Sequence, residues 1–182
     1  MEYVIQGIGL LGAVFAFIAF QCKKHFFIML VKACSALCFV VQFALMGAYT
    51  GLAMNALGIL MMVTDAILVS KNIKTLPSTI LFLIAAVTLG ILSWMNATSL
   101  LAIAGKVIIT IACGIKDPKR VKYFYFFGSV CWLIYDCFFF TLGGIITEVF
   151  TISSIIIATV QLIRAEKKET KAEEQKKTDN PQ

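Results

Sequence analysis

Long apolar stretches separated by short polar loops dominate this sequence and limit the folds that are open to it. A helix that crosses a lipid bilayer needs about 20 mostly apolar residues. Seven stretches come close to that length, and they cover residues 4–21, 26–47, 51–70, 78–95, 99–115, 121–141 and 144–163. The sequence therefore predicts an all-α integral membrane protein with seven transmembrane helices.

The overall composition points the same way. Hydrophobic residues make up 60% of the chain, charged residues only 14%, and the mean hydropathy is +0.90. Soluble domains carry about a quarter charged residues, so a soluble globular protein is excluded. The net charge of +6 comes largely from loops and tail, and it is not interpreted as a nucleic-acid signal. The lipid bilayer is the expected partner.

The basic loops predict how the chain crosses the membrane. They follow the first, third and fifth stretches, and the loops after the second, fourth and sixth contain no lysine or arginine. Basic loops stay in the cytoplasm, so the N-terminus is predicted outside and the C-terminus inside. The polar tail, residues 166–182, is predicted to be cytoplasmic and disordered. The basic loop residues are Lys23, Lys24, Lys71, Lys74, Lys116, Lys119 and Arg120.

A second pattern indicates an internal duplication. Cys38–Asn55 and Cys131–Glu148 share one layout: a cysteine, an aromatic residue, bulky apolar residues, a glycine turn and a polar residue four positions past the glycine. One ungapped shift, 105 − 12 = 93, aligns the first three stretches with the last three. We therefore expect three-helix repeats at 1–72 and 98–165, with a linker helix in 73–97. Aligned pairs include Gly12/Gly105, Cys38/Cys131, Gly51/Gly144, Asn55/Glu148 and Lys71/Arg164.

Both repeats begin on the outer side, so they are parallel repeats. This three-one-three plan resembles the SWEET sugar transporters and the wider PQ-loop group, although Phe20-Gln21 and Cys113-Gly114 stand where that group has its Pro-Gln motif. A closer resemblance is to the bacterial inner-membrane YgjV-type family. It is carried by the residues from Phe20 to Lys23 and from Phe43 to Gly51. That resemblance implies a multi-pass inner-membrane protein, and it implies little about chemistry.

Charged residues inside the apolar stretches are the main site candidates. Lys106 lies near the centre of its stretch, where a lysine costs about 2.5–3.5 kcal/mol on insertion scales. Asp136 and Glu148 lie in the other two stretches of the same repeat. We expect Lys106 to pair with one of these two acids facing a polar cavity. The alternatives are a purely structural ion pair and a lysine that extends to the interface.

The matching site of the first repeat is neutral, because Gln42 and Asn55 stand where Tyr135 and Glu148 stand. The resemblance to sugar carriers implies that an asparagine on the third helix of a repeat, here Asn55, contacts the substrate. A packing role for Asn55 is the alternative. Asp65 is expected to meet Lys71 or Lys74 near the inner interface, and a transport role for Asp65 is the alternative.

No enzyme motif is present: the sequence has no GxSxG, no HExxH and no phosphate loop. Six cysteines without a CxxC and one histidine do not match metal-site spacing, so no metal or cofactor is expected. The predicted function is transport of a small polar solute by alternating access between two three-helix bundles. The alternative is a membrane scaffold that docks partners through its tail. Self-association into a homo-oligomer stays open.

Overall fold

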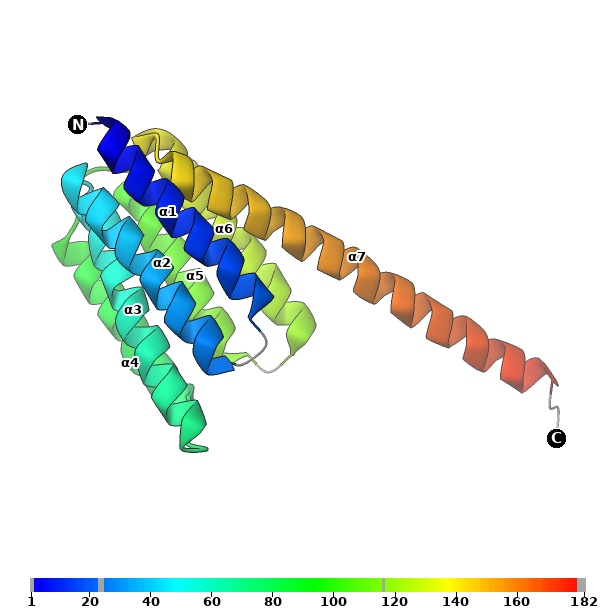
Figure 1. The fold of residues 1–182 in the computed structure, drawn as a ribbon. Helices are drawn as coiled ribbons and strands as arrows, with labels where there is room; N and C mark the ends of the chain where they lie inside the picture. The colour runs from blue at the N-terminus through cyan, green and yellow to red at the C-terminus, as the bar shows by residue number, and fades with distance from the viewer. Residues whose placement is uncertain (1, 23–24, 116, 180–182) are drawn as a thin grey trace.

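Seven α-helices make up the fold of the described residues, which are 2–22, 25–115 and 117–179 of a computed structural model (Figure 1). The all-α prediction is confirmed, and most predicted helix ends lie within three residues of the observed ones. The helices are α1 (Glu2–Gln21), α2 (His25–Leu45), α3 (Tyr49–Ser70), α4 (Leu76–Leu92), α5 (Ser99–Gly114), α6 (Pro118–Phe139) and α7 (Leu142–Asp179).

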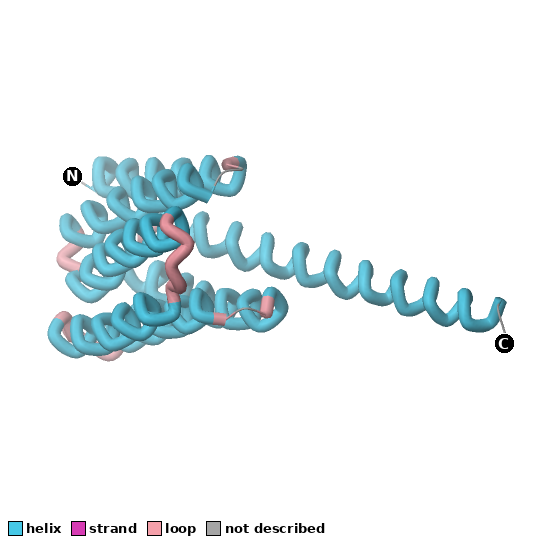
Figure 2. The backbone as a smooth tube through the Cα atoms, turned by 90° about the horizontal axis from the view of Figure 1, so that it is seen from below, coloured by secondary structure: helices cyan, strands magenta, loops and turns pink. Residues whose placement is uncertain are grey.

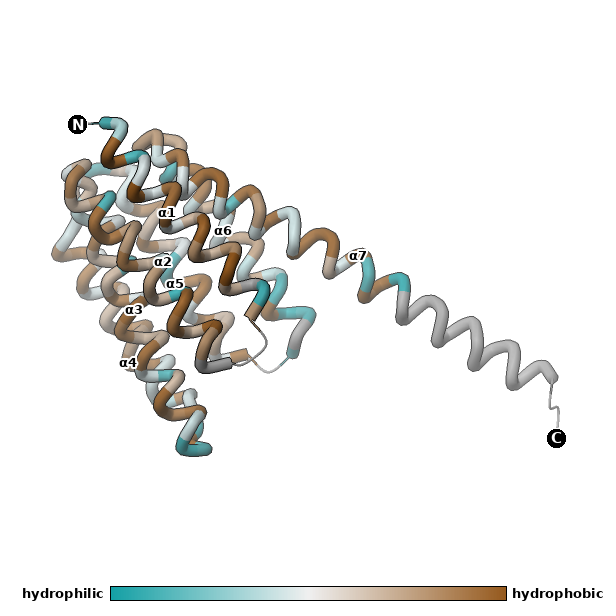
Figure 3. The backbone as a smooth tube through the Cα atoms, viewed as in Figure 1, coloured by the Kyte–Doolittle hydropathy of each residue, from teal (hydrophilic) through white to brown (hydrophobic). Residues whose placement is uncertain are grey.

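Several of these helices suit a membrane. By length and composition, α1, α2, α3 and the first part of α7 are able to cross a bilayer, whereas α4 and α5 are apolar but only 17 and 16 residues long. Large apolar side chains such as Leu60, Leu81 and Ile91 point outward. Figure 3 shows hydrophobic residues along the helices of the bundle and hydrophilic ones near the loops. Such an apolar exterior is what contact with lipid tails requires.

Six of the helices form a closed ring. Contacts join α1 to α2, α2 to α3, α3 to α5, α5 to α6, α6 to α7, and α7 back to α1. Helix α4 packs on α3 and α5, at the outside of this ring. The ring places residues from both ends of the sequence around one central space.

Helix α7 continues beyond the bundle to Asp179, so most of the segment predicted to be disordered is helical (Figures 1 and 2). The segment consists mainly of alanine, glutamate, lysine and glutamine. These residues have high helix propensity and let the helix persist after its apolar face ends. The last three residues of the predicted tail, 180–182, lie outside the described residues.

Two tight turns of similar geometry join α2 to α3 and α6 to α7. Each contains one residue with left-handed φ, +70° at Gly47 and +52° at Phe140. The residue that follows donates its N–H to the carbonyl five positions earlier, over 2.9 Å from Ala48 and 3.0 Å from Thr141. Glycine adopts this backbone conformation without steric cost, whereas phenylalanine does not.

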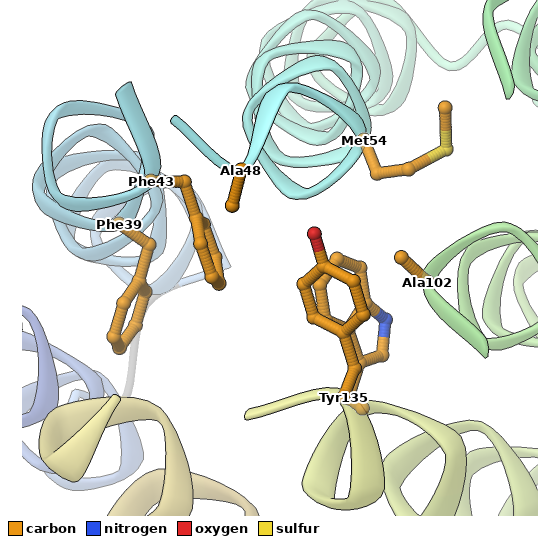
Figure 4. Close-up of a cluster of buried hydrophobic side chains, with 7 residues drawn as sticks. Phe39, Phe43, Ala48, Met54, Ala102 and Tyr135 are labelled. Atoms are coloured by element: carbon orange, nitrogen blue, oxygen red, sulfur yellow. The ribbon is translucent and has the colours of Figure 1, made fainter. Parts of the chain in front are cut away.

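The main apolar core includes Ala48 of the α2–α3 turn, and Figure 4 shows its side chains. Aromatic rings from α2 and α6 meet there, with the centroid of Tyr135 5.7 Å from those of Phe43 and Trp132. The Tyr135 hydroxyl points toward α3 (Figure 4) and accepts a hydrogen bond from Gly51 N over 3.0 Å. This packing seals the ring at the end where the turns lie. The cluster comprises Phe39, Phe43, Ala48, Met54, Ala102, Trp132 and Tyr135.

Candidate functional site

A cavity of about 510 Å³ occupies the centre of the helix ring. We call it the central cavity. All six ring helices contribute side chains to its wall, and none of the described residues of α4 does. The wall carries buried charges, polar groups and aromatic rings, so it is the strongest candidate for a functional site in the described part of the chain.

The two ends of the central cavity differ in exposure. Near the turns, the lining residues Phe43, Met54 and Asp136 are buried. At the opposite end, the lining residues Lys32 and Lys122 are partly exposed. The cavity is therefore sealed beneath the two turns and opens toward the loops that carry the basic residues.

Lys106 projects from the middle of α5 and is only 8% exposed. Its ammonium group crosses to α3, where a Cβ added to Gly58 would lie 3.1 Å from Lys106 Nζ. Glycine at this position leaves the space that the ammonium group occupies. Asp65, further along α3, interacts electrostatically with this lysine.

Asp136 and Glu148 form an acidic pair on the opposite wall. Asp136, 3% exposed, accepts a hydrogen bond of 2.6 Å from the Thr141 hydroxyl. Its carboxyl group packs on Gly144, where an added Cβ would lie 2.5 Å from the carboxyl carbon. Gly144 precedes Glu148 by one helical turn on the same face of α7, and the two carboxyl groups interact electrostatically.

Glu148 is the least satisfied member of this pair. Its Oε2 atom is buried and has no hydrogen-bond partner among the described residues. The Ser129 side chain lies beside the carboxyl group. Buried carboxylate oxygens are almost always partnered, because leaving one unpaired forfeits its hydration. Glu148 therefore has one oxygen that could accept a further hydrogen bond at the wall of the central cavity.

The predicted ion pair between Lys106 and an acid is wrong for the described side chains, because no salt bridge joins Lys106 to Asp136 or Glu148. The reason is geometric: Lys106 extends to α3, and Asp136 is held by the α6–α7 turn. All three side chains nevertheless line the central cavity. They share a site without neutralising one another directly.

The two neutral candidates, Asn55 and Gln42, differ in whether they line the central cavity. Asn55 lines the central cavity, and its Nδ2 donates to Gly51 O over 2.9 Å within α3. Gln42 is not part of the wall. It is fully buried against Gly9, with its Nε2 3.5 Å from Gln6 Oε1. The prediction of Gln42 as a substrate contact is therefore not supported by its position, since its helix turns that side chain toward α1.

Asp65 lies in the last third of α3, and its pairing with Lys71 or Lys74 stays a prediction. It lines the central cavity and accepts a hydrogen bond from Ser78 Oγ over 3.2 Å, from the first turn of α4. Lys71 and Lys74, the expected partners, are exposed. Asp65 thus belongs to the open end of the cavity.

Sequence reasoning missed much of the wall. The aromatic side chains of Phe39, Phe43 and Trp132 line its sealed end, and apolar runs gave no reason to select them. The hydroxyls of α7 were detectable, because Thr147, Thr151 and Ser154 recur at spacings of four and three around Glu148. That spacing places them on one helix face.

These features define a multi-helix membrane protein with a charged central cavity. Comparison with family models identifies the family: a model described as a bacterial inner membrane protein, Imp-YgjV, matches residues 3–166. The chain belongs to this family, so the predicted resemblance and the inner-membrane location are confirmed. Comparisons with curated proteins and with solved structures give no match.

Proposed function

We propose that this protein transports a small polar solute across the inner membrane by alternating access between two three-helix bundles. The first bundle is α1–α3, the second is α5–α7, and α4 links them. The observation that carries the proposal is the central cavity, which lies between the bundles, contains buried charges, and is sealed at one end only. No enzymatic step is part of this proposal.

Internal symmetry of the wall supports the two-bundle mechanism. The shift of 148 − 55 = 93 relates cavity positions as well as sequence. Twelve of the thirteen lining residues that precede α4 have a lining counterpart 93 positions later, Ser35 being the exception. Turn residues Gly47 and Phe140, with their positive φ, are related by the same shift. Parallel repeats that enclose a central site are an arrangement used by transporters.

The positive-inside rule supports an orientation for this state. The open end of the cavity faces the loops with Lys71 and Arg120, so it would face the cytoplasm, with the N-terminus outside. The structure would then represent an inward-open conformation. Transport requires a second conformation in which the sealed end opens.

The contacts at the sealed end suit a gate. Gln6 of α1 donates from Nε2 to Phe140 O over 2.7 Å and accepts from Leu142 N over 3.0 Å. Across the ring, the hydroxyl oxygens of Thr50 and Ser99 are hydrogen-bonded over 2.9 Å. Gln6 and Ser99 are again 99 − 6 = 93 positions apart, and each joins one bundle to the turn of the other. A few such bonds, worth about 0.5–1.5 kcal/mol each, hold the gate without locking it.

Thiol accessibility tests alternating access without knowledge of the solute. Asn55→Cys is introduced into an otherwise cysteine-free chain, reconstituted in vesicles and treated with a membrane-impermeant thiol reagent from either side. Alternating access predicts reaction from both sides. Tyr49→Cys, exposed at a turn, and Lys71→Cys, exposed at the basic loops, are one-sided controls. Reaction of Asn55→Cys from one side alone contradicts the proposal.

One observation favours a second function, that of a scaffold. Helix α7 is 38 residues long and extends beyond the bundle (Figure 2). Its last part would be available to bind a partner protein. In a scaffold, truncation after Arg164 abolishes the cellular role, whereas Lys106→Met and Glu148→Gln leave it intact. A transporter gives the opposite result.

A further inference from the structure

We propose that the sealed end of the central cavity binds the ammonium group of the solute, between the acidic pair Asp136–Glu148 and the rings of Phe43 and Trp132. This inference rests on the proposed function in one respect: it takes the cavity as the solute site. It adds the chemical class of the ligand and the end of the cavity at which the charged group binds.

The acidic pair at this end of the cavity favours a cation as ligand. Two carboxyl groups interact there, and Glu148 Oε2 is buried without a hydrogen-bond partner among the described residues. The lysine that α5 contributes to the wall, Lys106, is turned toward Gly58 on α3. A buried carboxylate without a countercharge is strongly disfavoured. A positively charged group that enters the cavity satisfies both the charge and the unpaired oxygen.

The surrounding side chains favour an organic cation over a metal ion. Trp132 precedes Asp136 by one turn of α6, and the ring centroids of Trp132 and Phe43 are 6.5 Å apart. Aromatic faces attract organic cations through their quadrupoles. In the described part of the chain, no three His, Cys, Asp or Glu residues gather in a metal-binding group. Phe39 and Met54 extend the apolar surface, which suits the carbon chain next to an ammonium group (Figure 4).

The other end of the cavity has the opposite character. Lys32, Lys106 and Lys122 all line it toward the opening, with Asp65 among them. A second, anionic group on the solute would meet these lysines while its ammonium group binds the acidic pair. Two sources therefore share the ammonium chemistry, a simple amine and an amino acid, and the experiment must separate them.

Trp132 supplies a reporter within the site. The chain has two tryptophans, and the other, Trp94, is exposed in the α4–α5 loop. Trp94→Phe therefore leaves a single tryptophan, which lies in the wall of the cavity. The full-length variant in detergent is titrated with three probes that share one carbon chain: pentylamine, norleucine and hexanoate. They present an ammonium group, an ammonium with a carboxylate, and a carboxylate alone.

The expected result is a saturable change in Trp132 fluorescence with pentylamine or norleucine and none with hexanoate. Tighter binding of norleucine identifies an amino acid as the source, and tighter binding of pentylamine a simple amine. In the same background, Glu148→Gln weakens binding at least tenfold. Asp136→Asn is the second variant, should the first fail to fold, and exposed Glu2→Gln is the matched control with unchanged affinity.

Three outcomes overturn the inference: hexanoate alters the fluorescence as strongly as the two ammonium probes, neither ammonium probe alters it, or both acid variants bind as the parent does. The thiol experiment separates this inference from the proposed function. If ammonium probes bind but Asn55→Cys reacts from one side only, the transport proposal is contradicted and the ammonium site is not. If Asn55→Cys reacts from both sides but no ammonium probe binds, the ammonium site is contradicted and the transport proposal is not.

Discussion

The two walls of the central cavity have matching positions and different chemistry. Along α3 and α7, side chains 93 positions apart line the cavity at corresponding places. The α3 wall is mainly apolar, whereas the α7 wall carries hydroxyls and a carboxyl group. The contrasting pairs are Met54/Thr147, Asn55/Glu148, Gly58/Thr151 and Met61/Ser154, whereas Met62/Ile155 is apolar on both walls and Asp65/Ala158 has its carboxyl group on α3.

Helices α2 and α6 show the same contrast. Phe43 packs near Gly51, with its ring 3.1 Å from the position of an added Cβ, and Asp136 packs on Gly144 in the corresponding way. A ring in one half thus occupies the place of a carboxyl group in the other. Paired positions therefore define the shape of the cavity, and under the proposed function the differences between paired residues would determine which solute it binds.

The largest expected effect comes from moving the carboxyl group to the other wall. The double variant Asn55→Glu with Glu148→Asn keeps the composition of the pair and separates the acid from Asp136. We expect pentylamine affinity, measured by Trp132 fluorescence, to fall about 100-fold, because separating partners of a buried charged site costs about 2–5 kcal/mol. Unchanged affinity would show that the two walls are equivalent, contrary to the comparison.

A second test fills the space beside Gly58 on the α3 wall, which the Lys106 ammonium group occupies. Gly58→Val places a branched side chain against Lys106 Nζ, for which a single Cβ already lies at 3.1 Å. Overpacking of this kind costs about 1–3 kcal/mol, so we expect a lower thermal unfolding midpoint in detergent. Thr151→Ser at the paired position keeps the hydroxyl, which donates to Thr147 O over 2.8 Å, and adds no atoms, so it serves as control. Equal midpoints for the two variants would mean that the lysine is not held there.

The gate offers a third test. Tyr135→Phe removes the acceptor for Gly51 N at the sealed end, which weakens the contact between the bundles by about 1 kcal/mol. The outer reaction rate of Asn55→Cys should rise about fivefold, and the inner rate should fall. Exposed Tyr123→Phe should change neither rate. A decrease of both rates for Tyr135→Phe would instead indicate general loss of structure.

These comparisons also show what the sequence was able to predict. Helix number and most ends followed from apolar length. Lys106, Asp136 and Glu148 were selected because charged groups are costly in a bilayer, and Asn55 because it aligns with Glu148 and resembles an asparagine of the sugar carriers. Their common cavity was expected. The direction of the Lys106 side chain was not predictable, since it depends on Gly58 of a distant helix.

The aromatic residues of the cavity wall were also not predictable from hydrophobicity. Phe43 and Trp132 stand in runs where nearly every residue is apolar, so hydrophobicity alone does not separate a lipid-facing ring from a cavity-facing one. The 93-residue shift held the missing information. It pairs Phe43 with Asp136 and Phe39 with Trp132, and a position that carries a charge in one copy marks its partner as facing the interior.

The smallest expected effect concerns the turns, where the two halves match in backbone and differ in residue. Phe140, 76% exposed at φ +52°, adopts the left-handed conformation that Gly47 adopts freely at +70°. Phe140→Gly should therefore raise the free energy of unfolding by about 0.5–1 kcal/mol, and Gly47→Ala should lower it by about 1 kcal/mol. Thermal unfolding in detergent measures both. Opposite signs for the two variants would support equivalent turns, whereas destabilisation by Phe140→Gly would mean that the ring contributes more, through contact with lipid or detergent, than its backbone strain costs.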